Sequence, residues 1–188
     1  MGQRLVVSLT DEDQNTIAVV YYHWSAYFAS TIEECANLGK AIVESEKDGK
    51  DVLTSILDML EKNGGGIGVN DRNLEEAAKR FPGREFRSDI SRNNGLIYLG
   101  NEEIQETLDM AEGTAEINIP SKMVYNGVLH SDFFDFQFYD GGCKVNGQSI
   151  DVDPEEMTID ECIRLDDFIR RIYLDDFITR NNRTKKGE

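Results

Sequence analysis

The chemically most capable side chains of this sequence gather in one segment, Tyr21-Tyr22-His23-Trp24-Ser25-Ala26-Tyr27, which holds the only tryptophan. A histidine near a serine could supply the base and the nucleophile of a hydrolytic site. His130, the second of two histidines, would join them if the fold brought it close to His23. Because no third member and no oxyanion motif is recognisable, His23, Ser25 and His130 are catalytic candidates beside a simpler interpretation, a packed strand end with a hydrogen-bonded histidine.

Paired carboxylates form the second group of candidates. Asp166-Asp167 and Asp175-Asp176 stand in a near-repeat, Leu-Asp-Asp-Phe-Ile at 165–169 and again at 174–178. Adjacent carboxylates could hold Mg²⁺, but a metal-dependent nuclease also needs further acidic or lysine partners at motif spacing. No such pattern is recognisable, and the Gly-Gly-Gly-Ile-Gly stretch at 64–68 lacks the lysine and Ser/Thr of a phosphate loop. We therefore expect no metal and no cofactor.

The spacing of this repeat carries a geometric consequence. Nine residues at ~100° each leave half a turn, so the two copies face opposite sides of one straight helix. Either the helix breaks near Tyr173, or the second apolar face meets another chain, or the near-repeat is a chance similarity. We expect a homodimer, because two offset apolar faces are hard to bury in one small domain.

Hydrophobic periodicity predicts the elements that must position these residues. The β-branched segments 4–9 and 16–24, separated by a polar stretch, predict a β-hairpin. Ser30 and Glu33 form a capping-box pattern before a predicted helix at 31–47. Further helices are expected at 53–60, stopped by the glycines from Gly64, and at 73–80, ended by Pro82-Gly83.

The second half predicts strands at 96–99, 115–119, 123–129 and 133–139 and a hairpin at Asn146-Gly147, with a helix at 102–111 among them. A long amphipathic helix follows, started by Asp153-Pro154-Glu155-Glu156 or by Thr158-Ile159-Asp160-Glu161, and it ends near Arg180. Since helices and strands do not alternate regularly, we expect an α+β fold, an antiparallel sheet with helices on one face. Residues 1–188 are predicted to form one domain, with 64–68 as the best boundary if it is divided and a disordered basic tail at 181–188.

Composition limits the classes of function. The 188 residues carry a net charge of −16 from 36 acidic and 20 basic side chains, which argues against direct binding of duplex DNA. Solubility alone would explain such an excess. The sharper interpretation is mimicry, because sixteen charges match about 27 Å of duplex at ~1.7 Å per charge. Three distant cysteines and the lack of a signal-peptide pattern or a long apolar run favour the cytoplasm and exclude a membrane role.

The opening of the chain resembles known proteins. Met1-Gly2-Gln3-Arg4-Leu5, the acidic turn after it and the segment Tyr21–Tyr27 resemble the start of small proteins encoded by phages and prophages of Gram-positive bacteria, over about the first fifth of the chain. This resemblance implies a viral origin and transfers no catalytic residue. In size, acidity and lack of cofactor motifs the chain is also similar to anti-CRISPR proteins, which implies binding to a CRISPR effector where nucleic acid should lie.

The leading hypothesis is an anti-CRISPR inhibitor of a type II effector or of its guide-RNA complex, acting through acidic surface. The candidate contacts are Asp11, Glu12 and Asp13 in the first turn and Asp166, Asp167, Asp175 and Asp176 in the last helix. Reversing the helix aspartates to lysine is predicted to abolish binding. The alternatives are a hydrolase or nuclease built on His23 that destroys guide RNA or another substrate, and a structural or regulatory phage protein that assembles through its last helix.

Overall fold

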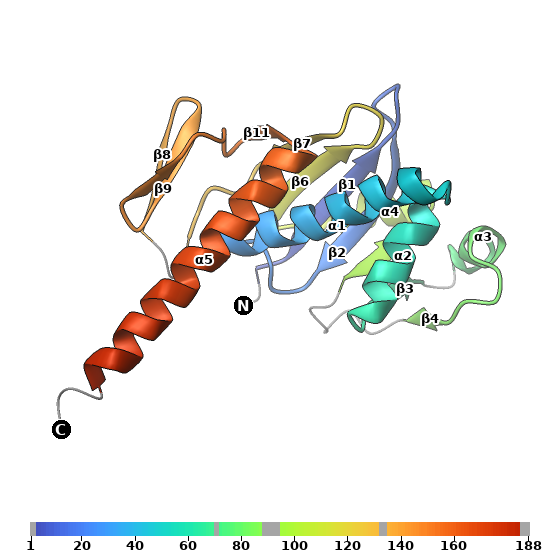
Figure 1. Cartoon of the computed structure of the whole chain (residues 1–188). Helices are drawn as coiled ribbons and strands as arrows, with labels where there is room; N and C mark the ends of the chain where they lie inside the picture. The colour runs from blue at the N-terminus through green and yellow to red at the C-terminus, as the bar shows by residue number, and fades with distance from the viewer. Residues whose placement is uncertain (1–2, 70–71, 88–94, 132–134, 185–188) are drawn as a thin grey trace.

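The computed structural model describes residues 3–69, 72–87, 95–131 and 135–184, with side chains up to Asp175. Its centre is an eight-stranded sheet in the order β11-β7-β6-β1-β2-β5-β3-β4 (Figure 1). A smaller antiparallel sheet, in the order β10-β9-β8, lies beside it. The strands are β1 Leu5–Thr10, β2 Thr16–Tyr22, β3 Gly66–Gly68, β4 Phe86–Arg87, β5 Leu96–Tyr98, β6 Gly113–Asn118, β7 Met123–Asn126, β8 Phe136–Tyr139, β9 Gly142–Val145, β10 Gln148–Ile150 and β11 Glu156–Thr158.

The predicted first hairpin forms the middle of the large sheet. β1 and β2 pair antiparallel with Leu5 opposite Tyr22, and β1 pairs parallel with β6 on its other side. All six residues of β1 are buried. Since side chains alternate along a strand, both faces of the sheet must be covered here. Leu5, Val7 and Leu9 belong to the main core, whereas Val6 belongs to a second, smaller one.

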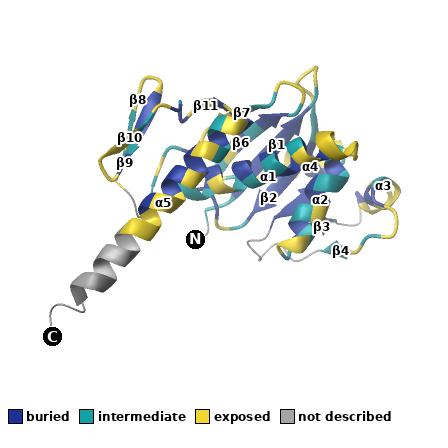
Figure 2. Cartoon of the chain, viewed as in Figure 1, coloured by how far each residue is buried: buried dark blue, intermediate teal, exposed yellow. Residues whose placement is uncertain are grey.

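Helices cover the two faces unequally. α1 (Phe28–Asp48), α2 (Val52–Lys62) and α5 (Ile159–Thr184) supply the main core with their apolar sides (Figure 2). The second core is covered by α4 (Asn101–Asp109) through Ile104, while α3 (Leu74–Arg80) connects β3 to β4. The α+β class and the C-terminal helix are confirmed. The sheet is mixed, because β1–β6, β3–β5 and β3–β4 pair parallel, and α4 lies on the face opposite the other core-forming helices.

The start of α1 differs from the prediction. The helix begins at Phe28, where the Thr31 amide donates to the Tyr27 carbonyl at 2.8 Å, and not after a Ser30 cap. The Phe28 amide donates to the carbonyl of His130 at 2.8 Å. A distant loop therefore supplies the acceptor for the first amide of the helix, where the sequence predicted a local capping box. Glu33 is thereby left to reach Arg170 of α5. The predicted capping box is wrong.

The start of α5 is the second of the two predicted alternatives. The Glu161 amide donates to the Thr158 hydroxyl oxygen at 3.2 Å, and the Thr158 amide donates to the Glu161 carboxylate at 2.9 Å. This is a reciprocal capping box. At its other end α5 runs to Thr184, four residues beyond the predicted end near Arg180, and the predicted disorder of the tail stays a prediction. Residues 185–188 lie outside the described part.

Replacing Thr158 with alanine should lower the free energy of unfolding by about 1 kcal/mol, because the first turn of α5 loses its side-chain acceptor. Urea unfolding followed by circular dichroism would measure this loss. Thr158→Ser keeps the hydroxyl group and should retain most of the stability. Equal losses in both variants would show that the cap is not what Thr158 contributes.

The glycines at 64–68 act differently from a flexible helix stop. Gly64, at φ +86°, follows α2 as predicted, but Gly66–Gly68 form β3 inside the sheet. A Cβ atom at Gly68 would lie 2.3 Å from the ring of Tyr98. Glycine is required there because an aromatic ring packs directly on the backbone. The suggested domain boundary at this stretch stays a prediction.

Candidate binding surfaces

The three catalytic candidates have separate hydrogen-bond and ring partners. The Tyr21 hydroxyl lies 2.7 Å from Nδ1 of His23, and the indole of Trp24 packs edge-on against the same imidazole. The exposed ring of His130 packs instead against Tyr27. Ser25 is buried, and its hydroxyl donates to Glu34 at 3.4 Å. These contacts support the interpretation of His23 as a hydrogen-bonded residue in a packed strand end.

Glu34, which the sequence did not single out as a functional residue, has a strongly raised carboxyl pKa. Burial beneath the core raises its pKa from 4.5 to about 8, with a smaller contribution from the neighbouring charge of Glu33. The buried Tyr22 hydroxyl lies beside the same carboxyl group, outside the geometry of a regular hydrogen bond. At neutral pH Glu34 is therefore mainly protonated, and it adds little to the acidity of the surface.

The described part of the chain contains no group of three or more His, Cys, Asp or Glu side chains placed to hold a metal ion. Cys35, Cys143 and Cys162 are buried and free. Burial raises the pKa of the Cys162 thiol to about 12 and that of Cys143 to about 11, so neither forms a reactive thiolate at neutral pH.

Asp166, predicted as a partner contact, is instead a buried residue. It is 2% exposed and lies between α5 and α1. Arg170 Nε donates to its carboxylate at 2.9 Å, and Lys40 Nζ of α1 lies 4.0 Å away. Burial raises the pKa of Asp166, and the hydrogen bond from Arg170 opposes that effect. The prediction fails because Asp166, four residues after Cys162 and three before Ile169, lies on the side of α5 that packs against α1.

The other predicted helix aspartates are scattered along α5. Asp167 is exposed. It lines a hollow on the protein surface together with Arg164 and Arg171. Asp175 is exposed two turns further along the helix, and the side chain of Asp176 lies outside the described residues. The proposed reversal of all four to lysine would place an uncompensated cation at Asp166 and disturb folding. It would not test binding alone.

The acidic turn between β1 and β2 has one structural and two free acidic side chains. Asp11 accepts the backbone amides of Asp13 and Asn15, each at 2.9 Å. The backbone amide of Asn15 is the largest cause of its lowered pKa. Asp11 therefore shapes the turn. Glu12 and Asp13 are exposed and have no ion pair within the described residues, so they remain available to a partner.

A second acidic surface lies along the edge of the sheet at β11. Segment 151–161, Asp-Val-Asp-Pro-Glu-Glu-Met-Thr-Ile-Asp-Glu, holds six acidic residues in eleven. Asp151, Glu155, Glu156 and Asp160 are exposed, and the described part of the chain places no basic side chain in an ion pair with them. Because β11 is an edge strand, these carboxylates face solvent along one side of the molecule.

Buried Asn126 holds this segment in place. Its side-chain amide donates to the Pro154 carbonyl at 2.9 Å and to the Val128 carbonyl at 3.0 Å, and its backbone amide donates to Glu155. Both donors of the side chain are thus satisfied by backbone. The acidic segment is fixed against β7 and does not need a partner to order it.

Hydrogen bonds through the β6–β7 turn bring the acidic turn to the same end of the sheet as the start of α5 (Figure 1). Asn118 donates to the Asp11 carbonyl at 2.8 Å, and the Ile159 amide donates to the Lys122 carbonyl at 2.8 Å. Lys122 itself pairs with Glu46 at 2.6 Å, so its charge is compensated by α1. We call Glu12, Asp13 and segment 151–161 together the acidic surface.

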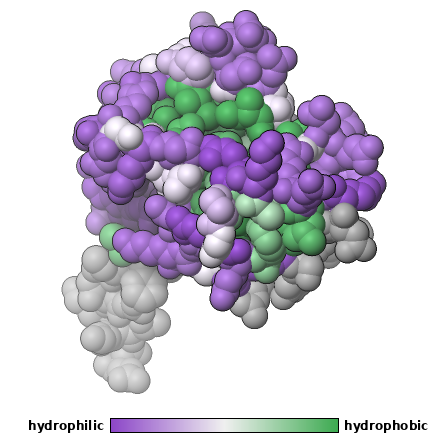
Figure 3. All heavy atoms as spheres, turned by 90° about the vertical axis from the view of Figure 1, so that its right-hand side faces the viewer, coloured by the Kyte–Doolittle hydropathy of each residue, from purple (hydrophilic) through white to green (hydrophobic). Residues whose placement is uncertain are grey.

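No family model matches this chain, and neither a curated protein nor a solved structure is similar to it. Within the described residues, no helix is both long and apolar enough to cross a membrane. The face seen from the β4 side is mostly hydrophilic, with apolar side chains gathered in limited areas (Figure 3). What the protein binds must therefore be inferred from its own surfaces.

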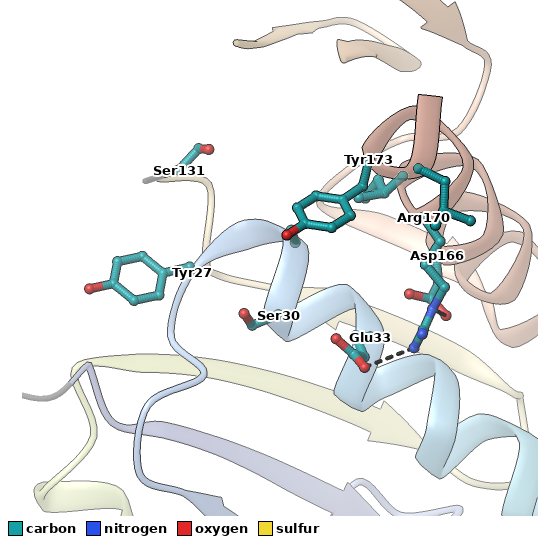
Figure 4. Close-up of a pocket in the computed structure, with 10 residues that line it drawn as sticks. Tyr27, Ser30, Glu33, Ser131, Asp166, Arg170 and Tyr173 are labelled. Atoms are coloured by element: carbon teal, nitrogen blue, oxygen red, sulfur yellow. Dashed lines mark hydrogen bonds and ion pairs between the residues drawn. The ribbon is translucent and has the colours of Figure 1, made fainter. Parts of the chain in front are cut away.

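A groove lies between the start of α1 and the second half of α5. Its volume is about 450 Å³. Arg170 crosses it from α5 and donates to Glu33 at 2.8 Å, with Tyr173 lying over the start of α1 (Figure 4). Tyr27, Ala29, Ile169 and Leu174 give it apolar walls. It lies at the end of α5 away from the acidic surface, so the two surfaces can act independently.

Proposed function

We propose that this protein acts by binding, and that its acidic surface competes with nucleic acid for a cationic surface on a partner protein. The observation that carries the proposal is segment 151–161, whose exposed carboxylates form no ion pair with any described residue. Elsewhere the acids are often neutralised locally, as in the pairs Arg80–Asp51 and Arg84–Asp58. Segment 151–161 is a dense part of the negative charge, with six acidic residues in eleven.

Electrostatic steering supports this mode of action. A surface of one sign raises the rate at which an oppositely charged partner is met, and a groove lined by lysine and arginine attracts carboxylates as it attracts phosphates. A fixed acidic edge also loses little entropy on binding, because Asn126 already orders its backbone.

The partner we propose is a type II CRISPR effector or its guide-RNA complex, met in the cytoplasm of a bacterial host. This step rests on the resemblance of the first residues to phage and prophage proteins and on the likeness in character to anti-CRISPR proteins. An effector's heteroduplex channel is positively charged and binds backbone phosphates without reading their sequence. Such a channel suits a non-sequence-specific acidic competitor.

A DNA-cleavage assay with a type II effector tests this proposal. The protein is titrated into the reaction while a gel follows the guide RNA. We expect inhibition to be complete at about one chain, or one dimer, per effector, with the guide intact, as tight binding requires. Inhibition by substoichiometric protein with a shortened guide would contradict it and favour the nuclease built on His23. No inhibition at any ratio would refute this choice of partner.

A further inference from the structure

The second half of α5 leaves the body of the protein. The last buried side chain of the helix in the described part is Ile172, and the backbone stays helical to Thr184. Residues 173–184, which we call the arm, therefore extend about 18 Å at 1.5 Å per residue. Tyr173 and Leu174 are each 57% exposed where the arm begins (Figure 2). An isolated helix of this length is marginal in water and needs packing to persist.

The arm repeats a sequence that already packs on a helix. Leu165, Phe168 and Ile169 of the first Leu-Asp-Asp-Phe-Ile copy are 0%, 8% and 5% exposed, in the main core with α1. The arm contains the same five residues at 174–178. The helix does not break near Tyr173, so the two copies start half a turn apart on one continuous helix, and Leu174 lies at the groove beside the start of α1.

The groove beside the arm offers a matching surface. Its apolar walls include Tyr27, Ala29 and Ile169, and the acidic Glu33 also lines it. The end of the arm is basic, with Arg180 and Arg183, on a chain of net charge −16. One molecule thus presents both an apolar basic helix and an apolar groove on an acidic body. This self-complementarity is what a two-fold interface needs.

We propose that two copies of this chain associate through α5, with the start of each arm, at Tyr173 and Leu174, lying against the groove of the other copy. The interface is isologous, so each groove receives one arm. Tyr173 and Leu174 are its central apolar contacts, and the basic sequence at the end of each arm is opposite in charge to the rest of the other copy. The acidic surfaces stay free at the far ends. This inference stands independently of the proposed function, which a monomer could also perform.

Sedimentation of the full chain tests the dimer directly. We expect wild type to sediment at twice the chain mass of 21.3 kDa. Leu174→Lys should raise the dissociation constant of the dimer by about 100-fold or more, because each interface loses two apolar contacts and gains two buried cations. Leu74→Lys changes a leucine that is 45% exposed on α3 and should leave the dimer intact.

Circular dichroism checks whether the Leu174→Lys variant is still folded. Since Leu174 is 57% exposed in the single chain, its replacement should leave the body folded, and the far-ultraviolet spectrum should lose at most the helical signal of the arm. A wild-type chain that stays monomeric at high micromolar concentration would overturn the proposal, and it would mean that the groove receives another protein or nothing. A dimer that Leu174→Lys does not weaken would overturn it as well, since the interface would then lie elsewhere.

Discussion

Replacing Glu34 with glutamine should make the protein more stable in mildly alkaline solution by up to about 5 kcal/mol. The pKa of Glu34 is about 8 in the folded chain, against an ordinary value of 4.5. Between these values the folded state keeps a proton that the unfolded state has released, so stability falls as pH rises through this window. It is highest below about pH 4.5 and levels off above about pH 8. Glutamine is neutral throughout and removes this dependence.

Urea unfolding at about pH 5 and about pH 9 would measure the effect as a difference between variant and wild type. Burial also raises the pKa of Asp166. The contribution of such groups to the pH dependence is the same in both proteins and cancels in the difference. Glu44→Gln, at an exposed position of the same helix, is the matched control and should follow wild type at both pH values. If the gap between Glu34→Gln and wild type were the same at both, Glu34 would be ionised in the fold.

Reversing Glu155 and Glu156 to lysine should weaken binding to the partner by about 100-fold, because two attractive contacts with a cationic surface become repulsive. Both side chains are exposed, and the described structure gives neither of them an ion pair. The fold should tolerate the change. The backbone bond from Asn126 to the Glu155 carbonyl is independent of the side chain.

Titration calorimetry against the effector with its guide would measure this loss. The matched control reverses Glu75 and Glu85, which are exposed near β4 at the opposite edge of the sheet. It changes the net charge by the same amount and should lower affinity only slightly, through the long-range field. Equal losses in the two variants would mean that total charge, and not segment 151–161, determines binding.

Most elements could be predicted from the sequence because their signals are local. The apolar spacing of Leu53, Ile56, Leu57 and Leu60 predicts α2, and Asn146-Gly147, at φ +48° and +81°, predicts the tight turn between β9 and β10. Signals that depend on distant residues failed. The start of α1 was misplaced because its first amide is satisfied by His130, a hundred residues later in the chain.

The candidate contact residues differ in whether the sequence predicts their exposure correctly. Glu12 and Asp13 are exposed in a turn that the sequence located, because turn residues protrude whatever lies elsewhere. Asp166 was misassigned although its spacing carries a signal: it stands four residues after Cys162 and three before Ile169, both buried. Exposed Asp167 lies on a different side of the helix.

Two further functional features, segment 151–161 and Glu34, could have been recognised from the sequence. Six acids in eleven residues at 151–161 are visible in the sequence, but they were interpreted only as helix starts. Glu34 stands three residues after Thr31 and four before Leu38, both fully buried, and that spacing places it on the side of α1 that faces the core. A charged residue inside an apolar stripe indicates a shifted pKa.

The central claim is that the acidic surface occupies a site meant for nucleic acid. The most direct measurement is the affinity of the protein for the effector–guide complex with and without target DNA already bound. Mutual exclusion predicts that bound DNA weakens the protein's affinity by at least about 100-fold, and that the protein weakens DNA binding by the same factor. Equal affinity for the two complexes would contradict the claim, because the protein would then bind outside the nucleic-acid channel.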